Sequence, residues 1–375
     1  MKIGIDARMY GTRSGGLGRY VQKLIENLEK IDSQNEYVIF LRQENWEEYT
    51  PSVKNFRKVL ADVYWYGWRE QIILPGILRR EKLDLMHFPH WNIPILYRGG
   101  FVVTIHDLIL RRHPTRRAST LGFFMYVFKN ILYRIITAWA AHRAKKIFTV
   151  SQNAAADIVE LLHVPREKIV VTYLAPSFEQ GIDREMARDY VRQKFGLQGD
   201  YALYVGVAFP HKNLERLVRV WQKVRLKLPE ATLVLAGKEN YFYKNLQEIL
   251  ENEGLMGVRR IDFPNDEDVH HLMSAARLYV MPSMFEGFGV PPLDALVCNT
   301  PVVSSNVTSL PEVLGEAALY FDPTNETEMV DAIWRGWTDE NLRFEILRNA
   351  PAELEKFSYV RMADSTLSVY RQVKK

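Results

Sequence analysis

The chain has 375 residues, of which 47% are hydrophobic and 25% charged, and this composition is typical of a soluble globular protein. The length predicts two domains, each large enough to bury a core of its own. A formal net charge of +4 is too small to indicate a nucleic-acid-binding protein. The single cysteine, Cys298, excludes internal disulfides and a cysteine-based zinc site, and we expect it to be a small packed hydrophobe.

The sequence shows no signal for export or for insertion into a membrane. It starts MKIGIDAR, without a basic segment followed by an apolar one, so no secretory leader is expected. No uncharged apolar run reaches the roughly 18–20 residues that a membrane span requires. We therefore expect a cytoplasmic protein.

An apolar strand and a glycine-rich loop open the chain. Residues 2–5 predict a short strand ending at Asp6, and a helical pattern runs from 17 to about 31. Gly15, Gly16 and Gly18 occupy the turn between them, where glycine lets the backbone approach a ligand closely. Their spacing is not that of the dinucleotide fingerprint, which makes a nicotinamide dehydrogenase a poor fit.

Three further strands are expected at 37–41, 85–87 and 101–105. The last one ends at His106 and Asp107, at the carboxyl end of a strand, where ligands gather in open α/β sheets. A lone histidine is more often structural, and Asp107 is expected to cap or orient the turn. His87 and His90 resemble metal ligands, but no third ligand is evident, so we interpret them as loop residues lining the wall of a cleft.

Residues 111–146 are the compositional outlier, with nine Lys/Arg, no Asp/Glu and several aromatic residues. Much of the segment, from 120 to 144, has the length of a helix and is apolar on more than one face. One interpretation is a buried helix of the amino-terminal domain with a basic end. Another is an interfacial helix that meets anionic lipid, with the aromatic run at 63–69 as a second anchor. Nucleic acid is the third option, and nothing else in the sequence supports it.

The boundary between the domains is placed in the polar segment 174–183, and the second sheet is expected to begin at 201–206. Lys212 follows that strand at the entry to a helix, where a lysine can meet a phosphate as a point charge; a solvated lysine is the alternative. Residues 265–268, Asn-Asp-Glu-Asp, resemble a metal motif. They are better interpreted as a helix cap with acids in the first turn.

Residues 278–304 carry the clearest pattern, that of strand, glycine turn, helix and strand. An apolar run at 278–281 is followed by Glu286-Gly287-Phe288-Gly289, a predicted helix at 290–298 and a second apolar run at 300–304. Such a unit directs free backbone N–H groups and the positive end of a helix dipole at one spot, which suits a diphosphate. Glu286 and Asp294 frame the unit, and a carboxylate can bind the adjacent hydroxyls of a sugar or ribose. The alternative is a solvated loop Glu and an exposed helix Asp.

This region closely resembles the retaining glycosyltransferases of family 4, which have the GT-B fold. The resemblance rests on Pro-Ser-x-x-Glu-Gly-Phe-Gly-x-Pro from Pro282, the acid at 294, Pro-Val-Val-x-Ser from Pro301 and Pro-Glu-Val from Pro311. It implies an α/β protein of two Rossmann-like, doubly wound domains facing across a cleft. Residues 1–177 would bind the acceptor and 178–357 the nucleotide sugar, with a last helix, about 358–375, crossing back to the first domain.

The resemblance also implies two catalytic residues. Glu286 is expected to bind the hydroxyls of the donor sugar, and His106 to lie beside that sugar and the leaving phosphate. The ribose-binding acid of the family is Asp294 here, one methylene shorter. The other donor-binding positions are Gly15, Gly16, Lys212, Gly287, Phe288, Gly289 and Val290.

The chain departs from the family at the diphosphate site. The family carries an Arg and a Lys in the turn before the second domain's first helix; Lys212 matches, whereas the Arg position is Val207. One cation is therefore missing, unless another residue such as Arg8 or His211 supplies it. No metal is expected, because GT-B enzymes typically need none.

The implied function is transfer of a hexosyl group, with retention, to a saccharide or lipid-linked acceptor in cell-surface polysaccharide synthesis. The pattern looks most like mannosyl- and rhamnosyltransferases, so GDP-mannose is the first expected donor and a UDP- or dTDP-sugar the second. A nucleotide-sugar epimerase of the same fold and a non-catalytic nucleotide-binding module are the alternatives.

Overall fold

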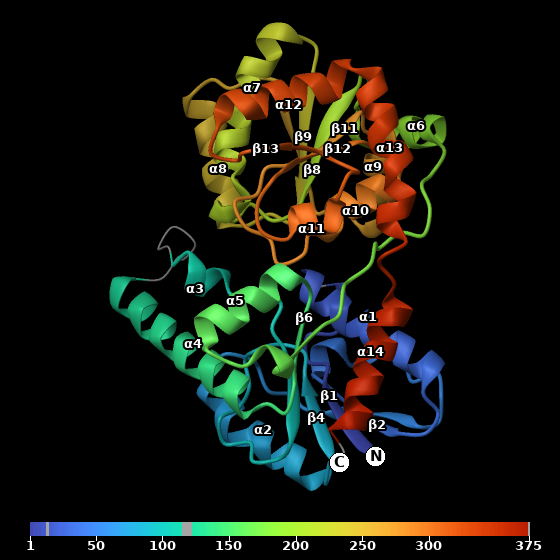
Figure 1. Ribbon diagram of the computed structural model, residues 1–375. Helices are drawn as coiled ribbons and strands as arrows, with labels where there is room; N and C mark the ends of the chain where they lie inside the picture. The colour runs from blue at the N-terminus through green and yellow to red at the C-terminus, as the bar shows by residue number, and fades with distance from the viewer. Residues whose placement is uncertain (13–14, 115–121, 374–375) are drawn as a thin grey trace. The chain divides into compact units, whose positions relative to one another are not determined.

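The computed structural model describes residues 1–12, 15–114 and 122–373 (Figure 1). The chain forms two compact units: unit 1 is Met1–Leu174 with Ser358–Lys375, and unit 2 is Ala175–Phe357. The first division falls at the start of the linker expected at 174–183. Within the described residues, no helix is both long enough and apolar enough to cross a membrane.

Unit 1 is built on a seven-stranded parallel sheet with the order β3-β2-β1-β4-β5-β6-β7. Its strands are β1 (Lys2–Asp6), β2 (Glu36–Leu41), β3 (Phe56–Leu60), β4 (Leu85–Phe88), β5 (Phe101–Thr104), β6 (Ile147–Thr149) and β7 (Ile169–Val171). Its helices are α1 (Gly15–Ile31), α2 (Trp68–Arg80), α3 (Ile109–Arg112), α4 (Phe123–Arg143), α5 (Gln152–Leu162) and α14 (Tyr359–Gln372). Neither β3 nor α2 was predicted from the sequence.

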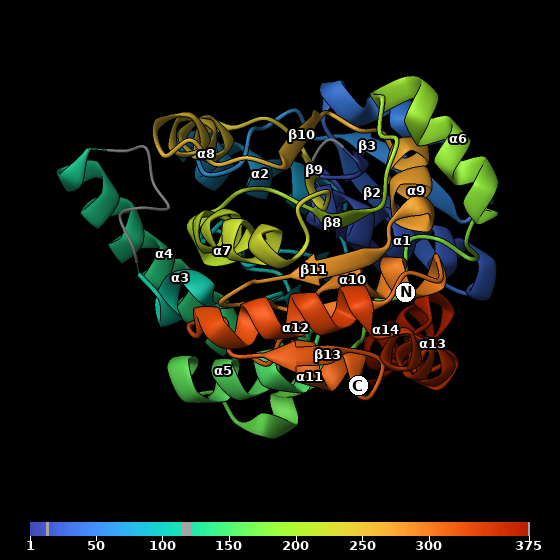
Figure 2. The same cartoon turned by 90° about the horizontal axis from the view of Figure 1, so that it is seen from above.

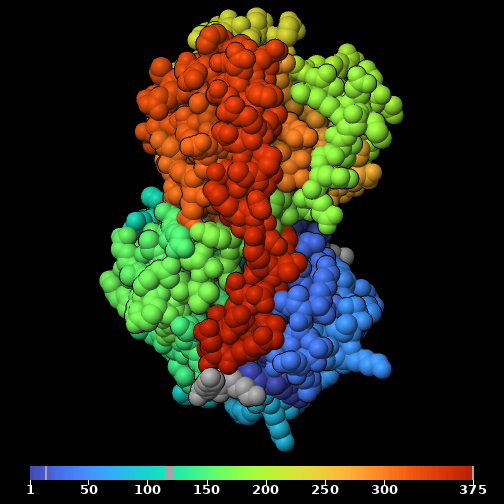
Figure 3. Space-filling view, turned by 45° about the vertical axis from the view of Figure 1, so that its right-hand side comes forward, coloured from blue at the N-terminus to red at the C-terminus, as the bar shows by residue number. Residues whose placement is uncertain are grey.

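Both faces of this sheet are covered, which explains why its central strands read as continuous apolar runs. Helices α1 and α14 pack on one face, around residues such as Ile5, Leu24 and Leu367. Helices α2, α4 and α5 pack on the other, around residues such as Leu74 and Ile158. Figure 3 shows the last helix, in red, lying against the blue N-terminal segment. The C-terminal helix therefore completes the core of unit 1, as the family resemblance implied.

Unit 2 repeats the architecture with a six-stranded parallel sheet, order β10-β9-β8-β11-β12-β13. Its strands are β8 (Tyr201–Val205), β9 (Thr232–Gly237), β10 (Val258–Asp262), β11 (Leu278–Met281), β12 (Val302–Ser305) and β13 (Leu319–Phe321). Its helices are α6 (Arg184–Phe195), α7 (Leu214–Lys227), α8 (Tyr241–Asn252), α9 (Asp266–Ala275), α10 (Val290–Val297), α11 (Leu310–Leu314), α12 (Glu326–Thr338) and α13 (Glu340–Leu354). Seen from above in Figure 2, α6 lies beside α9, and α12 packs against α7.

Local sequence signals set several helix starts. The Asn265 side chain accepts a hydrogen bond from the Asp268 N–H, and the Asp268 carboxylate accepts one from the Asn265 N–H. This acidic run is therefore a helix cap, as predicted, and has the form of a capping box. Helix α7 begins only at Leu214, because Pro210–Lys212 form a 3-10 turn and Asn213 has a φ of 61°. Asp107 accepts a hydrogen bond from the Ile109 N–H and orients the turn after β5, also as predicted.

The strand order places one switch point in each unit. In unit 1 the chain runs outward from β1 on one side and from β4 on the other; in unit 2 the corresponding pair is β8 and β11. Ligands of open α/β sheets bind outside the carboxyl ends of the strands at such points. The turns after β1, β4, β8 and β11 are therefore where a site is expected.

Candidate functional site

The turn after β11 depends on the left-handed backbone conformation of one glycine. Gly289 has a φ of +97° and immediately precedes α10, a conformation that a side chain rarely adopts. A Cβ at this position would also lie 2.8 Å from Leu310 Cδ2. The backbone conformation therefore favours the glycine predicted from the sequence, and a side chain here would also displace Leu310.

Glu286 and Lys212 meet at the switch point of unit 2. The Lys212 Nζ lies 2.7 Å from each carboxylate oxygen of Glu286 and donates to both. Glu286 is buried, and the hydroxyl of Ser283, itself fully buried, donates to its Oε1 at 2.6 Å. These residues come from the turns after β8 and β11, so the parallel pairing of the two strands brings them together. The alternative interpretations, a solvated Glu in a loop and a solvated Lys, do not describe this pair.

Two hydroxyls from the loop after β12 hold the Glu286 turn. The Thr308 Oγ1 accepts a hydrogen bond from the Glu286 N–H at 3.0 Å. The buried Ser309 Oγ lies 3.0 Å from the carbonyl oxygens of both Glu286 and Phe288. Thr308 has a φ of 52°, which is uncommon for any side chain and a marked outlier for a β-branched one. Neither residue was predicted from the sequence, where the only signal is a run of hydroxyl residues after a predicted strand.

Asp294 lies on the first turns of α10 and is buried. Its carboxylate accepts a hydrogen bond from the backbone N–H of Ser177, at the beginning of unit 2. The acid predicted for the ribose thus also anchors the segment that enters the unit. Cys298, at the end of the same helix, is buried, and burial raises the pKa of its thiol to about 12, which agrees with a packed hydrophobe.

Comparison with known proteins identifies this arrangement. The family model described as "Glycosyl transferases group 1" matches residues 188–353, and the one described as "Glycosyltransferase Family 4" matches residues 14–175. Over 307 residues the chain is 34% identical to the O-antigen chain mannosyltransferase B of Escherichia coli, covering 78% of this chain and 76% of that protein. The chain belongs to the family 4 glycosyltransferases.

The chain is also similar to a second bacterial mannosyltransferase and to a solved structure. It is 26% identical to the O-antigen chain mannosyltransferase RfbU of Salmonella typhimurium, over 73% of this chain and 70% of that one. Its fold is GT-B: a sucrose-phosphate synthase from Thermosynechococcus elongatus superposes with a TM-score of 0.79, covering 100% of this chain and 99% of that chain at 18% identity.

In unit 1 of the glycosyltransferase, His106 follows β5 as predicted and is partly buried. Its Nε2 lies 3.0 Å from the carbonyl oxygen of Pro89, and its ring meets the ring of Tyr20 edge-on at 4.7 Å. A carbonyl only accepts hydrogen bonds, so Nε2 carries the proton and Nδ1 is left as an acceptor. Burial lowers the pKa of His106 to about 4, which keeps the imidazole neutral at physiological pH.

His87 does not line a cleft, so that interpretation was wrong. It lies within β4, is fully buried, and its two nitrogens are 2.5 Å from the Tyr370 hydroxyl and 2.8 Å from the Thr104 hydroxyl. Burial lowers the pKa of His87 to about 3. It is therefore a neutral core histidine that ties the C-terminal helix to the sheet.

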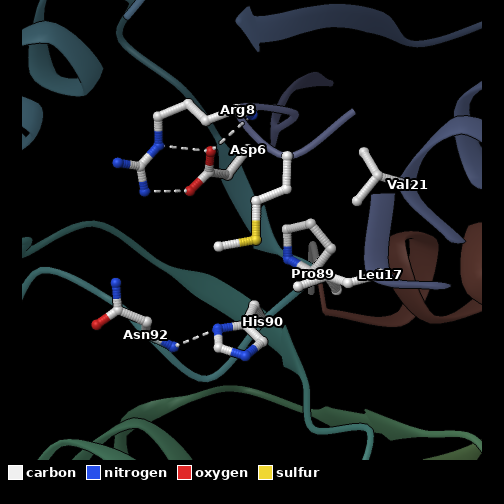
Figure 4. A pocket seen from close by; sticks show the side chains of 8 residues that line it. Asp6, Arg8, Leu17, Val21, Pro89, His90 and Asn92 are labelled. Carbon is white, nitrogen blue, oxygen red and sulfur yellow. Dashed lines mark hydrogen bonds and ion pairs between the residues drawn. The ribbon is translucent and has the colours of Figure 1, made fainter. Parts of the chain in front are cut away.

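A small pocket lies at the switch point of unit 1, at the carboxyl ends of β1 and β4 (Figure 4). Asp6 and Arg8 line it from one strand end, His90 and Asn92 from the other, and Leu17 of α1 adds an apolar wall. Gly15 and Gly16, at the start of α1, are exposed, and a Cβ at either would meet nothing within 4 Å. Only the φ of +64° at Gly15 favours glycine there.

Arg8, one candidate for the missing cation, is engaged by two acids of unit 1. It is buried; two of its nitrogens, Nε and a terminal one, pair with Asp6 at 2.8 and 2.7 Å, and the terminal nitrogen also lies 2.7 Å from Glu70. The ring of His211 stacks on Phe209, 5.7 Å between centroids. Within the described parts of the chain, no three His, Cys, Asp or Glu side chains come together as metal ligands.

Replacing Thr308 with Val is expected to lower the kcat/KM of transfer about ten-fold or more. Valine keeps the volume but leaves the Glu286 N–H without its acceptor, which costs about 1–3 kcal/mol. Steady-state kinetics in the nucleotide sugar measure the effect, and Thr308→Ser, which keeps the hydroxyl, should stay near wild type. Equal activity of the Val and Ser variants would show that the hydrogen bond has no part in positioning Glu286.

Proposed function

We propose that the enzyme transfers a mannosyl group from GDP-mannose to a saccharide or lipid-linked acceptor in cell-surface polysaccharide synthesis, with retention of anomeric configuration. The observation that supports a sugar-phosphate donor is the Lys212–Glu286 pair at the switch point of unit 2. The mannosyl assignment is supported by the two relatives that are named as O-antigen mannosyltransferases. As part of this proposal the enzyme associates peripherally with the inner face of the membrane.

In the proposed complex, the phosphate of the donor meets Lys212 and its sugar meets Glu286. With both oxygens of Glu286 2.7 Å from Lys212, the two charges compensate each other. A sugar diphosphate would give a phosphate oxygen to Lys212 and hydroxyl groups to Glu286, so each charged group exchanges one partner for another. The amides of Gly287, Phe288 and Gly289 would add donors to the diphosphate, and Asp294 would accept from the ribose.

The chemical step follows from this placement. The C–O bond between the sugar and the diphosphate breaks, while Lys212 and the turn amides stabilise the negative charge that grows on the leaving oxygen. The acceptor hydroxyl attacks the anomeric carbon from the same face, and its proton passes to the departing phosphate. Retention follows without a covalent intermediate. In this proposal Lys212 and the amides supply the positive charge, and no metal takes part.

A thermal-shift panel tests the donor. At 100 times its Kd a ligand adds about 2.7 kcal/mol of stability, which corresponds to a rise of about 5–10 °C in the melting temperature of a unit of this size. We expect such a rise with GDP-mannose and not with UDP-glucose, dTDP-rhamnose or ADP-glucose. A rise with a UDP- or dTDP-sugar alone would make that sugar the donor in place of GDP-mannose. No rise with any of the four nucleotide sugars would contradict the proposed function.

A second measurement separates transfer from epimerisation. The enzyme incubated with GDP-mannose alone should leave the sugar configuration unchanged, and GDP should accumulate when an acceptor is supplied. Proton NMR of the product then gives the anomeric configuration. An epimerised nucleotide sugar formed without acceptor would contradict the proposed reaction.

A further inference from the structure

Helix α4 presents an apolar stripe to solvent. Phe124, Phe128, Ile131 and Ile135 follow one another at spacings of four, three and four residues, which places them on one side of a helix. These side chains are between 52% and 86% exposed. The opposite side carries buried residues such as Tyr133 and Ala140. The helix lies along the outside of unit 1 (Figure 1), so the buried-helix interpretation of this segment holds for one side only.

A second exposed apolar group lies on α2, and the loop after β4 packs between α2 and the buried side of α4. The ring of Trp91, in the loop after β4, contacts Tyr133 of α4 at 4.7 Å and Tyr66 at 5.6 Å between centroids. Tyr66 leads into α2, where Trp68 and Ile72 are 72% and 61% exposed. The loop after β4 is itself tied to α2, because the Ile95 N–H donates to the Gln71 side chain at 2.8 Å.

A basic hollow lies at the end of α2 and beneath this loop. Arg79, Lys82 and Arg98 line it, together with Leu96 and Tyr97, around about 520 Å³ of space that includes the solvent at its mouth. Among the described residues, none of the three cations forms an ion pair. The neighbouring Glu81 is engaged elsewhere, by Lys2 and Arg57.

The end of α4 reaches the same hollow and brings further positive charge. The Arg143 guanidinium donates to the carbonyl oxygen of Arg98 at 3.2 Å. Segment 111–146, which contains α4, has nine Lys/Arg and no Asp/Glu. Of this charge Arg143 lies beside the hollow, whereas Arg112 is paired with Asp157 and Glu160 of α5.

We propose that this surface, the lipid face, rests on an anionic phospholipid bilayer and that the basic hollow takes a lipid phosphate. The lipid face comprises the α4 stripe, Trp68 and Ile72 of α2, and the three cations of the hollow. Apolar and aromatic side chains bury in the headgroup region, while Lys and Arg meet anionic headgroups. The inference rests on the proposed function, which places the enzyme at the membrane, and adds to it the surface that makes the contact.

The positive charge decides between a membrane and a second copy of the chain. A symmetric dimer through this surface would bring the same patch of both copies together, basic hollow against basic surroundings. Like charges so placed oppose association. An anionic bilayer supplies both the apolar layer and the opposite charge.

Co-sedimentation of the full chain with vesicles tests the lipid face. We expect binding to phosphatidylethanolamine vesicles that contain phosphatidylglycerol, and little to phosphatidylcholine vesicles. Each basic residue near an anionic surface contributes about five-fold to binding, so R79A/K82A/R98A should weaken it about 100-fold. F128D/I131D should abolish it. Leu226→Asp, an exposed apolar residue of unit 2, and Arg348→Ala are the matched controls and should bind as wild type.

Several outcomes would overturn the inference. Equal binding to both vesicle types would show that the hollow does not bind a lipid phosphate. No binding to either would show that the lipid face does not contact a membrane. If a low concentration of soluble glycerol 3-phosphate displaced the enzyme from vesicles, the ligand of the hollow would be a free phosphate. Sedimentation equilibrium showing a dimer that F128D/I131D dissociates, with vesicle binding unchanged, would make the surface a self-association interface. The GDP-mannose thermal shift should be the same in all variants, so a failure here stays separate from a failure of the proposed donor.

Discussion

Replacing Glu286 with Ala is expected to lower the kcat/KM of transfer by about 10²- to 10⁴-fold. In the proposed complex its carboxylate accepts hydrogen bonds from two sugar hydroxyls, and each charged hydrogen bond contributes about 1.5–3 kcal/mol. The variant should fold, because the turn is held by Thr308, Ser309 and Gly289 rather than by this side chain. Initial rates over a range of nucleotide-sugar concentrations measure the loss. Glu316→Ala, at an exposed position of the same unit, is the matched control.

Variants of Lys212 distinguish a catalytic role of Glu286 from a structural one. Lys212→Ala leaves the buried Glu286 without its counter-charge, so it should cost both stability and activity. The double variant K212A/E286A should recover stability and remain inactive. If the pair were only structural, activity would recover together with stability. Full activity of Glu286→Ala alone would refute the assignment of Glu286.

The unit 2 site could be predicted from the sequence because each half of it is local. A strand, a turn and a helix are recognisable from short-range patterns, and both Lys212 and Glu286 follow predicted parallel strands. Since the carboxyl ends of such strands share one edge of a sheet, the two side chains were expected near one ligand. Their direct contact at 2.7 Å, however, depends on β8 and β11 being neighbours, and the strand order is not written in either segment.

The hydroxyls that hold the turn could not be predicted in the same way. Thr308 reaches Glu286 from 22 residues farther along the chain, and it does so in a left-handed conformation that threonine rarely adopts. Local propensity argues against that conformation, so only the folded environment reveals it. Such conflicts between local preference and structure are expected near functional sites.

The burial of individual side chains could not be predicted from local sequence patterns either. His87 was interpreted as a loop residue lining a cleft, but it lies inside β4, which runs on to Phe88, and both faces of its sheet are covered. A polar residue inside such a strand is buried whatever its chemistry. In α4 the pattern predicted the helix correctly, yet the exposed side could be identified only once Tyr133 and Ala140 were seen to face the core.

The buried ion network of unit 1 is expected to carry a large share of that unit's stability. Glu70 is fully buried; it accepts from Arg8 at 2.7 Å, from the Asn92 amide at 2.6 Å and from the Tyr66 N–H at 2.9 Å. Arg8→Met would leave Glu70 and Asp6 without their shared cation. We expect it to lower the free energy of unfolding by about 3–5 kcal/mol, measured by urea denaturation.

The pH dependence of this loss identifies its cause. Burial already raises the pKa of Glu70, and Arg8 opposes that rise, so removing Arg8 raises the pKa further. A carboxyl whose pKa is higher in the folded than in the unfolded protein takes up a proton on folding, and its contribution to stability falls as pH increases. The destabilisation of Arg8→Met should therefore be smaller at acidic pH than at neutral pH.

Arg57→Met is the matched control, because Arg57 also pairs with two acids, Glu36 and Glu81, but on the surface of the same unit. Exposed pairs contribute at most about 1 kcal/mol. If Arg8→Met costs no more than Arg57→Met, the buried network is not what holds the unit together. If it costs several times more, Arg8 and Glu70 fix the ends of β1 and β4, and with them the pocket that His90 and Asn92 line.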